Sequence, residues 1–155
     1  MKHGPVVLVR TQGRLGQYAA PARRDVERWL RAAGCRLGVD QHHEISVLLT
    51  DNPTIRRLNR RWRRVDRPTD VLAFAMHEHL TPGRSPSAGP LGDIVISLPY
   101  TRRAARDADR SPRQHLAFVA IHGLLHLLGH DHQRPEETER MDVMEQTLLK
   151  EIDVA

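Results

Sequence analysis

The sequence has few of the residues that would place the chain outside a reducing compartment or inside a membrane. Cys35 is the single cysteine among 155 residues, so no intramolecular disulfide can form, and a cytoplasmic location is expected. The longest apolar runs, VVLV near the start and LLHLL later, fall far short of the roughly 20 residues that a transmembrane helix needs. Neither a membrane span nor a secretory signal peptide is therefore expected.

Lysine is also scarce: Lys2 and Lys150 are the only two, and arginine supplies almost all of the positive charge. The formal net charge is +5 and the calculated pI is about 10.3. A GC-rich genome that favours arginine codons would explain the abundance of arginine but not its clustering. Seven arginines fall between residues 56 and 67, opposed only by Asp66, whereas the stretch 136–153 is acidic. This asymmetry favours a surface that binds a polyanion.

The apolar periodicity and the turn signals predict one α/β domain over residues 1–155, with a small mixed β-sheet packed with helices. Pro21 fits a helix start and Gly34 a helix stop, and Asn52 followed by Pro53 fits the cap and first turn of a second helix. The segment 77–90 is rich in Pro, Gly and Ser and is expected to be an exposed loop. The expected order is β-α-β-α-β-β-α-α, with strands at 6–10, 44–50, 71–76 and 93–98, and helices at 22–33, from 52, from 111 to about 129, and from 135.

The segment HGLLHLLGHDH at 122–132 carries the central chemical pattern. His122 and His126 are four residues apart, so on a helix both imidazoles project from the same face. Gly129 fits a helix end, after which the chain can bring His132 to the same ion from another direction. Three neutral nitrogens are the donor set of a catalytic Zn²⁺ site, whose fourth position stays open. The sequence therefore predicts one Zn²⁺ per chain on a metal-binding helix in the C-terminal half, although Ni²⁺ or Cu²⁺ could use the same ligands.

Two other histidines lie close to this pattern. His130 falls in the predicted turn and is expected to be a loop residue. His115 precedes His122 by seven residues and shares its helix face, so it is a candidate substrate contact, but an ordinary first-turn histidine is the simpler interpretation. The ligand spacing also matches that of the metzincin peptidases, yet Gly123 stands where those enzymes carry the glutamate that acts as general base. This difference argues against peptide hydrolysis.

The same segment resembles the signature of the YbeY family of bacterial metal-dependent endoribonucleases, H-G-x-L-H-L-x-G-Y-D-H, with His130 in place of the tyrosine. Two further stretches are similar to family motifs in the same order. The first is LNRRWRRVDRPTDVLAF at 58–74, in which Trp62 is the family's aromatic residue and Ala73 replaces its usual serine. The second is LGDIVIS at 91–97. The resemblance extends from about residue 44 to about residue 149.

The resemblance implies that His122, His126 and His132 are the zinc ligands and that Arg63 is the arginine important for activity. Considered by itself, Arg63 could bind a scissile phosphate with two parallel N–H groups, or be one solvated member of the arginine run. Arg60 and Arg64 are candidate substrate contacts in the same run.

The resemblance further implies a single-strand-specific endoribonuclease that acts in ribosomal RNA maturation, at the 16S rRNA 3′ end, and in ribosome quality control. RNA and the ribosome or its proteins are the expected partners. Two alternatives stay open: a zinc peptidase or other amidohydrolase, and a non-catalytic ribosome-assembly factor whose metal is structural. The sequence leaves the oligomeric state, the nucleophile and the general base undetermined.

Overall fold

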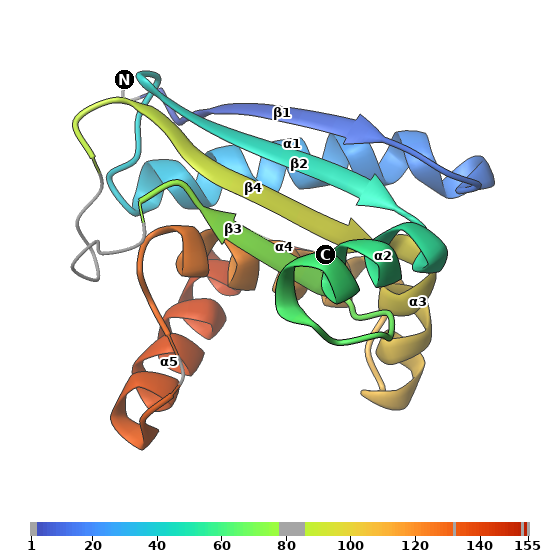
Figure 1. Cartoon of the computed structure of the whole chain (residues 1–155). Helices are drawn as coiled ribbons and strands as arrows, with labels where there is room; N and C mark the ends of the chain where they lie inside the picture. Colours follow the sequence, from blue (N-terminus) through green and yellow to red (C-terminus); the bar gives the residue numbers. More distant parts are fainter. Residues whose placement is uncertain (1–2, 78–85, 132, 153, 155) are drawn as a thin grey trace.

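A four-stranded mixed β-sheet organises the chain, which the computed structural model describes for residues 3–77, 86–131, 133–152 and 154. The strand order is β1-β2-β4-β3; β1, β2 and β4 are parallel, and β3 runs antiparallel to β4 (Figure 1). The strands are β1 (Val6–Thr11), β2 (His43–Thr50), β3 (Val71–Ala75) and β4 (Gly89–Ser97). The predicted α/β class with a small mixed sheet is thus confirmed.

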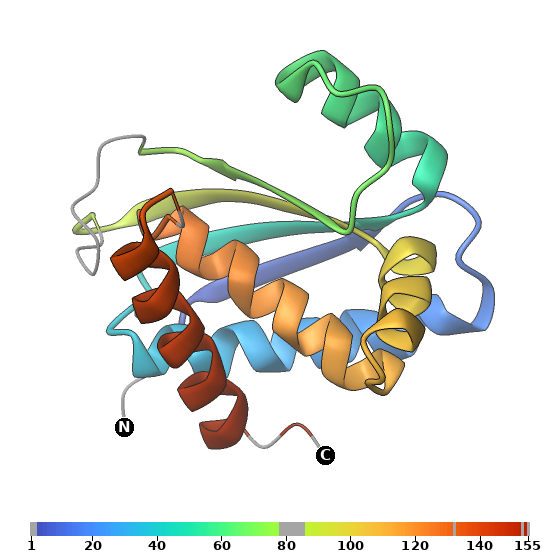
Figure 2. The ribbon, with the colours of Figure 1, turned by 90° about the horizontal axis from the view of Figure 1, so that it is seen from below.

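Helices cover the two faces of this sheet unequally (Figure 2). The main core lies on one face, under α1, α4 and α5, while a smaller cluster of Ile55, Leu72 and Val95 lies between α2 and the other face. The helices are η1 (a 3₁₀ turn, Gly16–Tyr18), α1 (Ala19–Arg36), α2 (Asn52–Arg63), α3 (Leu98–Asp107), α4 (Pro112–Leu127) and α5 (Pro135–Glu151). In the described part of the chain, every helix is too short or too polar to cross a bilayer.

The central element is α4, which packs against the sheet, α1, α3 and α5. It begins with the predicted capping box: Gln114 donates its backbone N–H to the Ser111 hydroxyl at 3.1 Å, and Ser111 donates its own N–H to the Gln114 side chain at 3.3 Å. These two bonds satisfy N–H groups that have no partner inside the helix. Beyond the cap most of α4 is apolar and buried, as expected for a helix with neighbours on several sides.

Gly123 lets α4 lie close to β4. A Cβ at this position would be 2.9 Å from Cγ2 of Ile94 and 3.2 Å from its Cδ1, distances that side chains avoid. Ile94 is fully buried and β-branched, so it has little freedom to move away. The glycine that replaces the metzincin glutamate therefore faces the packed interior, and a carboxylate could not be placed there without disrupting this contact.

One helix was missing from the sequence prediction. α3 follows β4 directly; the Ser97 hydroxyl accepts the Tyr100 N–H at its N-cap, and Leu98, Thr101 and Ala105 are its buried residues. The sequence predicts no helix over 98–107, because the few apolar positions of this segment are small or come at its very start. β4 also begins earlier than predicted, inside the expected loop 77–90, of which residues 78–85 lie outside the described part.

Three predicted helix boundaries were wrong, the first being the start of α1, which begins at Ala19 rather than at Pro21. Gly34 lies inside α1, where a Cβ would meet Cγ of Pro5 at 2.6 Å, so its role is close packing. The chain instead turns after the helix at Gly38, whose φ of 80° suits glycine. The cap of α2 is Asp51, whose carboxylate accepts the Thr54 N–H at 3.1 Å, and Asn52 is already helical.

The contact at Gly123 generates a stability prediction. Gly123→Val should lower the free energy of unfolding by about 1–3 kcal/mol, because the new methyl groups overpack the space beside Ile94. The measurement is denaturant unfolding of the metal-free protein. In an Ile94→Ala background the same substitution should cost less, since the opposing side chain is gone. An equal cost in both backgrounds would contradict this account of the glycine.

Candidate metal centre

Two of the three predicted ligands converge in the structure. His122 and His126 lie one turn apart on α4, and their Nε2 atoms are 3.0 Å from each other. The ring centroids are 4.6 Å apart and the ring planes are inclined by 68°. The helical spacing of four residues brings the two rings together on one face of α4.

Glu145 of α5 forms a hydrogen bond with the His122 ring on the side away from His126. Its Oε1 lies 2.5 Å from Nδ1 of His122, and the carboxylate side chain is only 2% exposed. A carboxylate accepts, so Nδ1 carries the proton and a neutral His122 then has a lone pair on Nε2. The hydrogen bond therefore selects the tautomer that a metal ion requires.

The residues present fit a transition-metal ion. Two imidazole nitrogens that share a tetrahedral Zn²⁺ at 2.0–2.1 Å would be about 3.3 Å apart, close to the observed separation. A buried carboxylate is costly unless it is paired, and a cation beyond the imidazole would compensate for that cost. Within the described part of the chain no group of three ligating side chains is found. His132, the predicted third ligand, lies outside the described residues.

The C-terminal end of α4 has the geometry that the glycine predicted. Gly129 has a φ of 88°, its N–H donates to the His126 carbonyl at 3.1 Å, and the His130 N–H donates to the Leu125 carbonyl at 3.0 Å. This pair of bonds is a Schellman motif, which ends a helix and turns the chain back. His130 follows it in the turn as predicted, and burial lowers the pKa of its imidazole.

His115, the predicted substrate contact, continues the row of rings along α4. Its ring centroid is 5.9 Å from that of Phe118, which in turn is 6.1 Å from that of His122. His115 is buried, and neither ring nitrogen has a hydrogen-bond partner among the described residues. Burial lowers its pKa, the charge of Arg110 acts in the same direction, and the charge of Asp70 opposes both. His115 is therefore a buried ring within this row, and little of its surface is accessible to a substrate.

The three arginines proposed for catalysis and binding lie on or next to α2. Arg63 donates from Nη2 to the Ala73 carbonyl of β3 at 2.8 Å, and its guanidinium carbon lies 5.6 Å from the centre of the Phe74 ring. Its side chain is thereby held against the edge strand. Arg60 is exposed on the helix, and Arg64 ends the helix in the left-handed conformation with its side chain in solvent.

Glu145 is the residue of this site that sequence reasoning missed. A signal was present: Met141, Glu145 and Leu148 are spaced i, i+4, i+7, so the glutamate shares a helix face with two buried apolar residues. A carboxylate in such a position is rarely buried without a partner. The partner itself could not be named, because nothing in the sequence pairs α5 with His122.

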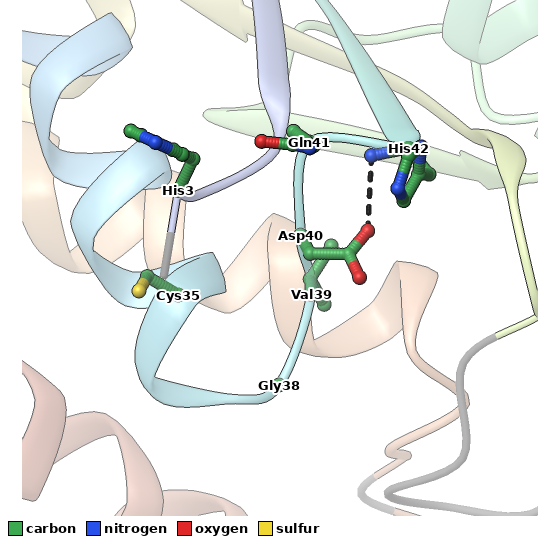
Figure 3. A pocket seen from close by; sticks show the side chains of 7 residues that line it. All are labelled: His3, Cys35, Gly38, Val39, Asp40, Gln41 and His42. Carbon is green, nitrogen blue, oxygen red and sulfur yellow. Dashed lines mark hydrogen bonds between the residues drawn. The ribbon is translucent and has the colours of Figure 1, made fainter. Parts of the chain in front are cut away.

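A separate hollow of about 310 Å³ near the start of β2 also contains histidine and cysteine (Figure 3). The His42 N–H donates to the Asp40 carboxylate at 2.9 Å, while His3 and Cys35 point away from that pair. These side chains do not converge on one position. The hollow therefore does not compete with α4 as a metal centre.

Comparison with known proteins identifies the family of this chain. The profile of the family described as Endoribonuclease YbeY matches residues 12–153. The chain belongs to the YbeY family. Relatives named Endoribonuclease YbeY include that of Bacillus subtilis, 37% identical over 140 residues, with 86% of this chain and 88% of the relative covered. Another, from Heliobacterium modesticaldum, is 43% identical over 113 residues, with 69% and 68% covered.

The comparisons also bear on length and fold. A YbeY protein of Myxococcus xanthus is 47% identical over 108 residues; the match covers 70% of this chain but only 36% of that protein. A Thermotoga maritima protein with a known solution structure shares the fold with a TM-score of 0.61. Its sequence identity is 24%, and the match covers 94% of this chain and 91% of that one. The YbeY motif at 58–74 corresponds to the end of α2, the loop after it and β3.

The bond between Glu145 and His122 predicts a loss of metal affinity on mutation. Glu145→Gln removes the buried negative charge with little change of shape, so affinity for Zn²⁺ should fall roughly 10- to 100-fold. Competition with a chromophoric chelator measures this change. Glu139→Gln, on the exposed side of α5, is the matched control and should bind as the unmodified protein does. Equal affinity of both variants would remove Glu145 from the site.

Proposed function

We propose that this chain is a single-strand-specific, zinc-dependent endoribonuclease that matures ribosomal RNA in the cytoplasm. Membership of the endoribonuclease family supports RNA as the substrate class. The observation that carries the metal-dependent part is the pair of Nε2 atoms 3.0 Å apart, with the buried carboxylate of Glu145 behind one of them. His132 completes the proposed ligand set, and one ion binds per chain.

The ion would supply Lewis acidity toward a phosphoryl oxygen and lower the pKa of water in the site. The protein's part is to hold His122 and His126 in one orientation. α4 fixes both rings on a buried helix, and Glu145 sets the proton of His122 on Nδ1. Rings that packing and hydrogen bonding already hold in place lose little freedom when an ion binds.

Arg63 is the proposed phosphate-binding residue. One of its five N–H donors is used by the Ala73 carbonyl, and the guanidinium rests against Phe74. This contact fixes the plane of the group and leaves other donors for a phosphate, where planar two-pronged binding is strong. Charge that develops on the phosphoryl oxygens during cleavage would be stabilised by the same group.

The remaining arginines of α2 supply general attraction for the RNA backbone. Arg56 is paired with Asp66 at 3.0 Å, but Arg60 and Arg64 are exposed. Such cations increase association without selecting a sequence. The positive charge of α2 also fits the ribosome as a partner. There, the RNA would reach the site together with ribosomal proteins.

The role of Arg63 predicts a defect that its neighbours do not share. Arg63→Lys keeps the charge but loses the planar fork, so cleavage of a labelled single-stranded RNA should fall tenfold or more, on the order of 1.4 kcal/mol of transition-state stabilisation. Binding of the RNA should change little. Arg60→Lys and Arg64→Lys are the matched controls and should cleave almost as the unmodified protein does.

His126→Ala must be inactive in the same assay, which excludes a contaminating nuclease. If all three arginine variants cleave at one rate, Arg63 has no special place in the reaction. If a His126→Ala preparation free of other nucleases retains activity, the metal-dependent mechanism itself is wrong.

A further inference from the structure

On the face of the sheet opposite α4, where α2 lies (Figure 2), residues of the sheet and of α2 line a groove of about 440 Å³. The proposed cleavage reaction uses none of its central residues. The helices of the main core do not reach this face, and α2 covers only part of it. Leu8 on β1 is consequently 52% exposed.

The strand register defines the floor of the groove. Leu8 is paired with Ser46, Ser46 with Asp93, and Asp93 with Phe74, so the four side chains form one row across the sheet, and all of them except Leu8 line the groove. Neighbouring strands are about 4.8 Å apart, which makes the row roughly 14 Å long. Asp93 is exposed in this row, and its carboxylate forms no hydrogen bond or ion pair with any described residue.

Two aromatic side chains, Trp62 and Phe74, line the same groove as this carboxylate. Trp62 of α2 is 59% exposed, and its ring lies 6.3 Å from that of Phe74 in an edge-to-face arrangement. The guanidinium of Arg61 lies 5.2 Å from the Trp62 ring. Trp62 and Asp93 line the same groove, so an exposed aromatic face and a carboxylate are both available there to a flat, polar ligand.

The charge around the groove favours a nucleic acid over an acidic ligand of another kind. Arg10 lines the groove at the end of β1, and Arg61 lies at the Trp62 rim. Both arginines could bind phosphates, while Asp93 gives the bottom of the groove a negative charge. A ligand that is anionic along its backbone and carries hydrogen-bond donors on a flat ring matches this arrangement.

We propose that this groove is a nucleobase subsite that binds an unpaired guanine of the RNA. Guanine stacks on Trp62 and presents two adjacent donors, N1–H and N2–H, to the two oxygens of Asp93. Adenine, cytosine and uracil do not offer two such neighbouring donors on that edge. The proposal rests on the proposed function in taking RNA as the ligand, and it adds a base preference at a distance from α4.

Fluorescence of the metal-loaded, full-length protein tests this subsite. Trp29 is buried, so a change caused by a ligand on the surface reports on Trp62. The probes are 2′-O-methyl RNA pentamers UUGUU, UUAUU and UUUUU, with their integrity checked after each titration. UUGUU should quench the fluorescence and bind at least fivefold more tightly than the other two. Trp62→Phe should abolish the signal.

Asp93→Asn should remove the preference for UUGUU, because an amide cannot accept both N–H groups. Glu44→Gln removes an exposed carboxylate on the same sheet face, outside the groove, and should keep the preference. Equal affinity for the three pentamers, or a preference that survives Asp93→Asn, would overturn the guanine subsite. An absence of quenching with every pentamer would overturn RNA binding in this groove and would favour a protein as its ligand.

Cleavage of unmodified RNA is measured separately and distinguishes this proposal from the one on which it rests. Base-selective quenching without cleavage would leave the subsite intact and refute the nuclease. Cleavage without base-selective quenching would support the nuclease and refute the guanine subsite.

Discussion

The close approach of α4 to β4 at Gly123 is the constraint on which the rest of the structure depends. Successive residues of a helix are rotated by about 100°, so the contact with Ile94 sets the direction of every other side chain on α4. With that face against the sheet, the row of His115, Phe118 and His122 is turned to another side, where Glu145 of α5 contacts His122. Any larger residue at 123 would move the helix and the histidines with it.

The proposed metal centre is consequently an extension of the core. Glu145 is buried between Met141 and Leu148, which pack into the main hydrophobic cluster, and its carboxylate ends on His122. The position of a ligand therefore depends on the packing of α5, and the packing of α5 includes a charge that an ion would neutralise. Binding and folding are coupled in such an arrangement, because the ion stabilises only the state in which the ligands are assembled.

The two faces of the sheet carry different chemistry. The histidines and Glu145 belong to the helical layer, whereas Trp62, Asp93 and the arginines of α2 lie on or beside the opposite face. Arg63 reaches β3, the edge strand that also lies over α4, and so connects the basic helix to the edge of the sheet. A single-stranded polyanion is long enough and flexible enough to contact both faces around this edge, which a small substrate could not do.

The sequence by itself determined the features that depend on neighbouring residues. The capping box of Ser111 and Gln114, the helix end at Gly129 and the shared face of His122 and His126 all follow from local geometry, and each was found as predicted. The α/β class followed from the apolar periodicity in the same way. Local signals failed where they were weak or ambiguous, as in α3, whose buried positions are few and small.

Only the tertiary structure decided which distant residues meet. The strand order, the pairing of Glu145 with His122 and the row from Leu8 to Phe74 join segments far apart in the chain. Gly123 shows the difference most clearly: the sequence identified it as the residue that replaces a catalytic glutamate, and the fold gave it a packing role against Ile94. Periodicity reports which face of an element is buried, but the partner on that face is chosen by the packing of the whole chain.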